Sequence, residues 1–126
     1  MQGVFLLYIG IGGFFGAISR FLISSSAGQA FGNYLPFGTL SVNVIGSFII
    51  GILALYFEQN IAPEHRALFI TGFLGSLTTF SAFSLETTLM IEQSHYFKAA
   101  SHIFLNVFLS VGATILAMVL YKKYIY

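Results

Sequence analysis

Four long apolar segments, separated by short polar breaks, dominate the chain. They cover roughly residues 3–25, 37–57, 68–91 and 100–121. Each is long enough to cross the hydrocarbon core of a bilayer as a helix, which takes about 20 apolar residues. None alternates between polar and apolar positions residue by residue, as the strands of a membrane β-barrel do. The pattern predicts an all-α integral membrane protein with four transmembrane helices per subunit.

The breaks between the apolar segments concentrate turn-forming and charged residues. "SSSAGQAFGNYLP" (24–36) contains glycine, asparagine and proline, whereas "EQNIAPEHR" (58–66) and "EQSHYFK" (92–98) are charged. Connections this short predict that neighbouring helices run antiparallel. The spans use nearly the whole chain, so residues 1–126 are interpreted as a single four-helix membrane domain.

The composition agrees with a membrane location. Of the residues, 57% are hydrophobic and 7% are charged, which is too little charge to cover a water-soluble surface. A net charge of +1 offers no basic field for nucleic acid. The chain has no cysteine, and His65, His95 and His102 lack the spacing of a metal site or a catalytic constellation, so we expect no enzyme. The N-terminal segment lacks the basic start and cleavage pattern of a signal peptide and is expected to be a retained span.

Lysine and arginine are divided almost evenly between the two ends of the predicted bundle. Arg66, Lys122 and Lys123 lie on the side of the N-terminus, whereas Arg20 and Lys98 lie on the other. An excess of these residues normally marks the cytoplasmic side, and three against two is a weak bias. Two interpretations stay open: one weakly determined topology with the first side cytoplasmic, or insertion both ways and pairing with an inverted copy.

Small residues on the first span favour close helix packing. A four-helix bundle of this size cannot enclose a water-filled pore, so transport would require at least two copies. Gly12 and Gly16 are four residues apart, as are Gly13 and Ala17, and this spacing lets another helix approach closely. That helix belongs either to a second copy or to the same subunit.

Three of the predicted spans each carry a file of hydroxyl or amide side chains along one face. The files are Thr39, Asn43 and Ser47; Ser81, Ser84 and Thr88; and Asn106, Ser110 and Thr114. His102 lies one turn before Asn106 and is assigned no role. Any one file has a structural explanation, because hydroxyls bond back to their own helix and amides link helices. Together they indicate a path of neutral donors, which can replace the hydration of a small ion without trapping it.

Two charged side chains and two phenyl rings lie near these files. Arg20 can extend to the membrane interface, whereas Glu86 is deep in the third span and is expected to face protein or water. Phe80 and Phe83 are three residues apart, so their rings share a helix face beside the hydroxyl file. A phenyl ring is negative on its face and positive at its edge. Ring edges turned towards a path would favour an anion, whereas ring faces turned towards it would favour a cation.

The third span also contains residues that weaken a helix. Gly72, Gly75 and the pair Thr78–Thr79 are predicted to interrupt it and to expose backbone carbonyls that need partners. Broken membrane helices use such carbonyls to hold cations, and the N-terminus of the following half-helix to face anions. A kink that serves only packing is the alternative.

Three motifs, in this order, resemble the Fluc fluoride channels, also called CrcB. They are "GGFFGAISR" (12–20), "GTLSVNVIGSF" (38–48) and "GFLGSLTTFSAFSLE" (72–86). The resemblance covers essentially the whole chain, and the third motif, with its TTFS core, is the most specific.

The resemblance implies an antiparallel, dual-topology homodimer in the bacterial plasma membrane, with two fluoride pathways built from both subunits. A structural sodium ion (Na+) would be held at the dimer centre by backbone carbonyls, at the positions of Gly75 and Thr78. The implied activity is passive export of cytoplasmic fluoride, because hydrofluoric acid enters cells neutral and ionises inside. The implied partners are fluoride, a second copy and the lipid bilayer.

The resemblance also assigns pathway residues. Phe80 and Phe83 match the phenylalanines whose ring edges face fluoride, Asn43 supports the pore at these rings, and Arg20 lies near an aqueous entrance. Glu86 matches the acidic residue of the third motif. The polar track is matched by Ser81, Ser84, Thr88, Ser110 and Thr114.

A second class of membrane protein has a similar size. Small multidrug transporters are proton-coupled, have four helices, and rely on a membrane-embedded glutamate in the first span. In this chain the charged residue of the first span is Arg20, and the acidic residue Glu86 is on the third. The transporter is therefore the alternative and the channel the main interpretation.

Overall fold

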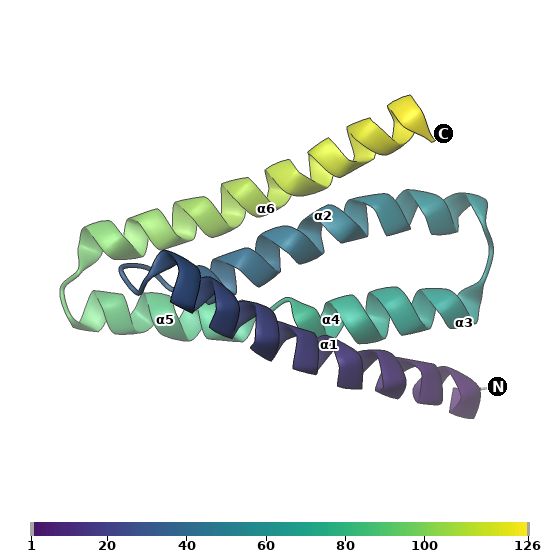
Figure 1. Ribbon diagram of the computed structural model, residues 1–126, viewed down its shortest axis with the longest axis horizontal. Helices are drawn as coiled ribbons and strands as arrows, with labels where there is room; N and C mark the ends of the chain where they lie inside the picture. The colour runs from purple at the N-terminus through teal and green to yellow at the C-terminus, as the bar shows by residue number, and fades with distance from the viewer. Residues whose placement is uncertain (1, 126) are drawn as a thin grey trace.

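The computed structural model describes residues 2–125, and these residues form helices joined by short connections. In chain order the elements are α1 (Gln2–Phe31), α2 (Phe37–Gln59), α3 (Pro63–Arg66), the π-helix η1 (Ala67–Leu74), α4 (Gly75–Leu77), α5 (Phe80–Glu92) and α6 (Tyr96–Tyr124) (Figure 1). Four stretches are long and apolar enough to span a membrane: α1, α2, the composite Pro63–Glu92 and α6. The prediction of an all-helical, four-span membrane protein is confirmed.

The first helix is longer than the apolar pattern predicts. Residues 24–31 continue α1 for two further turns, where the pattern predicts a break. The helix ends where Gly32 takes a φ of +84° and donates its N–H to Gly28 O at 3.0 Å. This left-handed C-terminal residue is a position that glycine adopts without steric cost. The sequence pattern therefore indicates the type of stop residue but places the helix end too early.

Neighbouring spans run antiparallel, as predicted. Both termini and the connection between α2 and α3 lie at one end of the molecule, and the α1–α2 and α5–α6 connections lie at the other (Figure 1). Lys122 and Lys123 in the last turn of α6 are therefore at the same end as Arg66.

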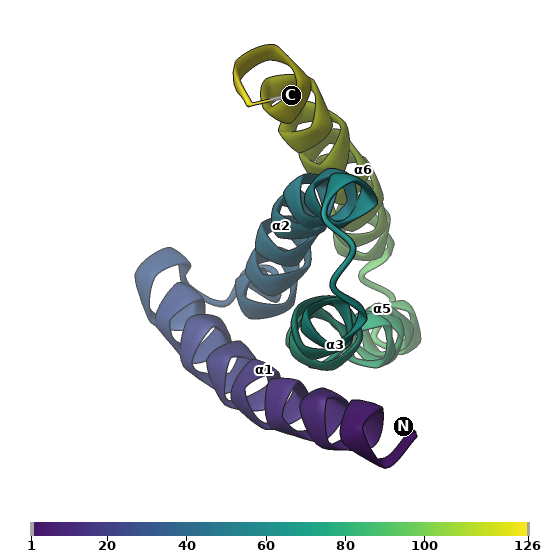
Figure 2. The ribbon, with the colours of Figure 1, turned by 90° about the vertical axis from the view of Figure 1, so that its right-hand side faces the viewer.

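Helix α2 lies at the centre of the molecule. Seen from the end that holds both termini, α6 and α1 occupy opposite edges, with α2 and the third span between them (Figure 2). In the most apolar 18-residue stretch of α2, 33% of the residues are buried, whereas the corresponding share is 11% in α1 and in α6. Its main partner is α6, whereas α1 packs chiefly on η1. The apolar core, Val42 with Leu74 and Leu77, lies between α2 and the third span.

Small residues allow α1 and η1 to touch backbone to backbone. A Cβ atom built on Gly12 would collide with Leu68 O, and one built on Gly16 would collide with Phe73 O. From the other side, a Cβ on Gly72 would lie 2.5 Å from Ile9 O. The small-residue face of the first span therefore serves packing within the subunit, which decides between the two interpretations of Gly12 and Gly16.

The third span is broken at two adjacent threonines. Thr78 (φ −84°, ψ 157°) and Thr79 (φ −149°, ψ 118°) are extended, between α4 and α5. Thr79 then caps α5, since its Oγ1 accepts from the N–H of Ala82 at 3.1 Å. The prediction of a broken helix is confirmed, but the part given to the glycines is wrong. Gly72 and Gly75 both remain helical, the first for close packing.

Candidate functional site

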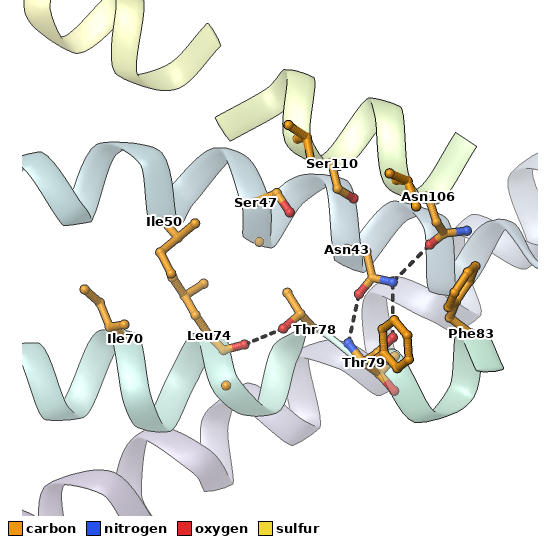
Figure 3. Close-up of a pocket in the computed structure, with 15 residues that line it drawn as sticks. Asn43, Ser47, Ile50, Ile70, Leu74, Thr78, Thr79, Phe83, Asn106 and Ser110 are labelled. Atoms are coloured by element: carbon orange, nitrogen blue, oxygen red, sulfur yellow. Dashed lines mark hydrogen bonds between the residues drawn. The ribbon is translucent and has the colours of Figure 1, made fainter. Parts of the chain in front are cut away.

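A cavity of about 480 Å³ lies between α2, the broken third span and α6 (Figure 3). We call it the central cavity. Its polar lining comes from Asn43, Ser47, Thr78, Thr79, Asn106 and Ser110. Apolar side chains that include Phe80, Phe83, Leu74, Val107 and Val111 complete the wall, and Gly46 and Gly75 are also exposed to it. The cavity therefore collects members of two of the predicted polar files, beside the break in the third span.

The side-chain amide of Asn43 holds the broken backbone in place. Its Nδ2 donates to Thr79 O at 3.1 Å, and its Oδ1 accepts from Thr79 N at 2.8 Å. Both backbone groups of Thr79 are thus satisfied by one side chain on α2 (Figure 3). Nonhelical backbone is tolerated at membrane depth only with such protein partners.

The break frees two carbonyl groups next to the central cavity. In an unbroken helix, Gly75 O would accept from Thr79 N and Thr78 O from Ala82 N. Here Thr79 N donates to Asn43 Oδ1, and Ala82 N donates to Thr79 Oγ1. The two helical donors are therefore engaged elsewhere, and Gly75 and Thr78 both line the cavity. Backbone carbonyl oxygens suit a hard cation such as sodium, so the donor type at these positions fits the ion.

A buried polar network continues from Asn43 into α6 and α5. Asn43 Nδ2 donates to Asn106 Oδ1 at 3.0 Å, and Asn106 Nδ2 lies 3.1 Å from His102 Nδ1. His102 Nε2 lies 3.2 Å from Glu86 Oε1, whose second oxygen accepts from the Thr39 hydroxyl at 2.8 Å. His102 is completely buried (0% exposed). These contacts agree with the expectation that Glu86 faces protein or water.

His102 and Thr39 are the network residues to which the sequence interpretation gives no specific role. The available signal is their spacing, because Thr39 precedes Asn43 by one turn and His102 precedes Asn106 by one turn. Two polar residues on each of two helices can meet a third helix as one network. Neither spacing predicts that Glu86, on the third span, lies opposite Thr39 and His102.

A second cavity, of about 500 Å³, lies at the end of the molecule that holds the α1–α2 and α5–α6 connections. We call it the end cavity. Thr39 and Glu86 line it, together with Lys98, whose Nζ lies 4.4 Å from the centre of the Tyr34 ring. His102 therefore lies between the two cavities. It contacts Glu86, which lines the end cavity, and Asn106, which lines the central cavity.

The two phenyl rings lie at the beginning of α5, beside the central cavity. Their ring centres are 5.4 Å apart with a 59° angle between the planes. Phe83 is half-buried and also packs on the His102 ring, with 5.3 Å between the ring centres, whereas Phe80 is 78% exposed. The pair predicted from the sequence therefore shares one face, at the electropositive start of a half-helix.

The predicted polar files differ in what their hydroxyls do. Among residues 2–125, the Ser110 hydroxyl is the buried side-chain polar group that has no hydrogen-bond partner. Thr114 donates to Ser47 O at 2.7 Å and so joins α6 to α2. Thr88 donates to Ser84 O at 2.9 Å, and Ser81 lies 3.3 Å from Thr79 Oγ1.

Several predicted pathway residues lie outside the central cavity. Ser81, Ser84 and Thr88 are exposed on α5, and Arg20 is half-exposed on α1. None of these four, nor Thr114, is part of the cavity lining. The structure thus brings together Asn43, Phe80, Phe83, Ser110, Gly75 and Thr78, and leaves the others on neighbouring surfaces.

The fold and the site define a four-span integral membrane protein with a polar cavity at the break of its third span. This is the organisation of a small membrane channel or transporter. The family model described as "CrcB-like protein, Camphor Resistance (CrcB)" matches residues 7–119. The chain belongs to this family, and the resemblance drawn from the three motifs is confirmed.

Curated relatives carry a more specific name. A protein of a Nitratiruptor species is 57% identical over 91% of this chain and 90% of its own length. One of a Sulfurovum species is 56% identical over 98% of both chains. One of Methanococcus maripaludis is 50% identical over 85% of this chain and 87% of its own. Each is named "Fluoride-specific ion channel FluC".

Proposed function

We propose that this chain is a fluoride-selective, passive ion channel that exports cytoplasmic fluoride. One observation carries the proposal. The central cavity places a free hydroxyl, two phenyl rings and the start of a half-helix together, in a chain whose relatives are named fluoride channels. No covalent chemistry is involved.

The geometry supports an anion that gives up its water. Both N–H bonds of Asn43 Nδ2 are engaged, one with Thr79 O and one with Asn106 Oδ1. Asn43 therefore shapes the pathway, and the Ser110 hydroxyl and the ring edges of Phe80 and Phe83 are the groups that contact fluoride. These neutral donors stabilise the ion without the strong fixed charge that would prevent its release.

The pathway requires a second, inverted copy. Phe80, Ser81, Ser84 and Thr88 are exposed on the α5 surface, where a single subunit would present three hydroxyl groups to lipid. Polar side chains at membrane depth normally face protein or a water-filled path. An antiparallel homodimer covers this surface and provides two pathways, each built from both subunits. The near-even charge count, with Arg20 and Lys98 opposite the other three basic residues, agrees with insertion in both orientations.

A structural sodium ion completes the proposed dimer. The carbonyl groups of Gly75 and Thr78 from each subunit would hold it at the dimer centre, where it would fix the two broken spans relative to each other. The support is that both carbonyls have lost their helical donors.

The remaining assignments follow from the same proposal. Arg20 attracts the anion at an aqueous entrance. Ser81, Ser84, Thr88 and Thr114 extend the polar track beyond the central cavity. The protein resides in the bacterial plasma membrane, where a passive leak of ionised fluoride lowers its internal concentration without ATP.

The alternative, a proton-coupled small multidrug transporter, is not favoured. Its mechanism needs a carboxylate in the substrate site that can exchange a proton for the substrate. Glu86 is instead held by Thr39 and His102 and lines the end cavity.

Fluoride efflux from liposomes that contain the purified protein tests the proposal. Fluoride should leave far faster than chloride, and protein-free liposomes measure the background leak. Comparable rates for the two halides, or fluoride release no faster than from empty liposomes, would reject a fluoride-selective channel.

A further inference from the structure

The directions of the hydrogen bonds in the buried network can be assigned from the backbone of Thr79. A backbone N–H can only donate and a carbonyl can only accept. Asn43 must therefore turn Oδ1 to Thr79 N (2.8 Å) and Nδ2 to Thr79 O (3.1 Å). The second hydrogen of Nδ2 points to Asn106, 3.0 Å away, so the Asn106 atom there must accept and is Oδ1 (Figure 3).

The same rule then fixes the proton on His102. With Oδ1 of Asn106 facing Asn43, its Nδ2 donates to His102 O at 2.9 Å and to His102 Nδ1 at 3.1 Å. Nδ1 must accept, so it carries no proton, and a neutral imidazole then has its proton on Nε2. Nε2 donates to Glu86 Oε1 at 3.2 Å.

We infer that neutral His102 is a positioning residue for Asn43: oriented by Glu86, it fixes Asn106 and, through it, the hold of Asn43 on the broken third span. A proton on Nδ1 would set two donors, Nδ1–H and Asn106 Nδ2–H, against each other. Asn106 cannot turn over to relieve this, because its Oδ1 would then face His102 O and its Nδ2 would face Asn43 Nδ2. A bare, accepting Nδ1 is therefore required at this point, and a side chain that cannot accept there loosens the break and reduces conduction.

The groups that surround His102 leave its ring as the link between Glu86 and Asn106. From α5, it faces the carboxyl group of Glu86 and the ring of Phe83. The α2 side presents hydroxyl and amide groups, which do not titrate. On α6 and its N-terminus, Lys98 and His95 line the end cavity with Glu86 and do not reach Asn106 in the hydrogen bonds of the described residues.

The tautomer can be tested without measuring transport. In a His65→Gln/His95→Gln background, the remaining His102 is labelled with ¹⁵N and its two ring nitrogens are observed by NMR at about pH 8, where histidine is generally neutral. We expect a protonated Nε2 and a bare Nδ1. A protonated Nδ1 would overturn the inference, whether or not the protein conducts fluoride.

The consequence for conduction rests on the proposed function and is tested by two substitutions. In His102→Gln, the amide offers one donor to Glu86 and one acceptor to Asn106. His102→Leu offers neither group. Fluoride efflux is measured for the wild type and both variants under the same conditions, with protein-free liposomes as the background.

The expected pattern separates positioning from a merely structural role. His102→Leu should reduce fluoride flux roughly fivefold or more, which is the scale of one lost net hydrogen bond. His102→Gln should restore the flux that His102→Leu loses. Flux in His102→Gln no higher than in His102→Leu, or wild-type flux in His102→Leu, would overturn the inference. A wild type without fluoride flux would instead reject the proposed function, and the tautomer alone would then decide the inference.

Discussion

Asn43 and Thr79, 36 positions apart in sequence, share two hydrogen bonds that run in opposite directions between one side-chain amide and one residue's backbone. Thr79 is 7% exposed and extended within a membrane span. Unsatisfied backbone groups in this environment cost several kcal/mol each. The break in the third span therefore depends on an amide supplied by α2.

Replacing Asn43 by alanine tests this dependence. We expect Asn43→Ala to lower the free energy of unfolding by about 2–4 kcal/mol, because two buried backbone groups lose their partner. Fluoride flux should fall with it. Asn60→Ala is the control, since the Asn60 amide is exposed and bonds Tyr56 O near the end of α2. If chemical or thermal unfolding in detergent gave equal stabilities for the two variants, the role assigned to Asn43 would be wrong.

Local patterns predict the break and the faces of the polar files. Threonine hydroxyls can bond to neighbouring backbone groups and so favour a break in a helix. Residues four apart share a helix face, so Asn43 and Asn106 both fall on inward files. Which hydroxyl is free is not predictable in this way. Ser110 and Thr114 belong to the same file, yet Thr114 is engaged by a carbonyl of α2 and Ser110 is not. That difference depends on which backbone atoms of α2 lie opposite each position of α6. The spacing of residues along one helix does not predict this.

The small residues of α1 make a second stability prediction. Gly12→Ala should destabilise the subunit by about 2 kcal/mol or more, because the new Cβ would collide with the backbone oxygen of Leu68. Gly10→Ala is the matched control on the same helix, where nothing lies within 4 Å of the added atom. It should be neutral or stabilising by about 0.5–1 kcal/mol, since alanine favours helix. Equal unfolding midpoints for the two variants would contradict the packing described for Gly12.

The phenyl rings beside the central cavity are predicted to act on conduction and not on assembly. Phe80→Leu and Phe83→Leu keep apolar volume but remove the electropositive ring edge. Each should reduce fluoride flux about tenfold or more, which corresponds to about 1.4 kcal/mol, while the oligomer measured by size-exclusion chromatography stays intact. Phe108→Leu, on the exposed face of α6, is the control. Unchanged flux in both cavity variants would reject the aromatic role.

Ser110 and Thr114 should differ in the quantity that they affect. Ser110→Ala removes a hydroxyl that has no protein partner, so stability should change by no more than about 0.5 kcal/mol, while flux falls about tenfold through loss of a donor to the anion. Thr114→Val removes the bond to Ser47 O and should cost about 1 kcal/mol of stability, with a smaller loss of flux. If Thr114→Val mainly lowered flux and Ser110→Ala mainly lowered stability, Thr114 and not Ser110 would be the residue that contacts the ion.

Removal of sodium tests the carbonyl site at the break. Replacing sodium by N-methyl-D-glucamine, which is too large to fit between carbonyl groups, should lower the unfolding midpoint of the assembled protein and silence fluoride flux, because an ion that binds only the folded assembly stabilises it. Thr78→Val distinguishes the ligand atom. The Thr78 hydroxyl donates to Leu74 O and is not needed by the ion, so this variant should keep its response to sodium. Loss of the response in Thr78→Val would point to the hydroxyl as ligand, and wild-type flux and stability that are equal in both salts would exclude a structural sodium ion at Gly75 and Thr78.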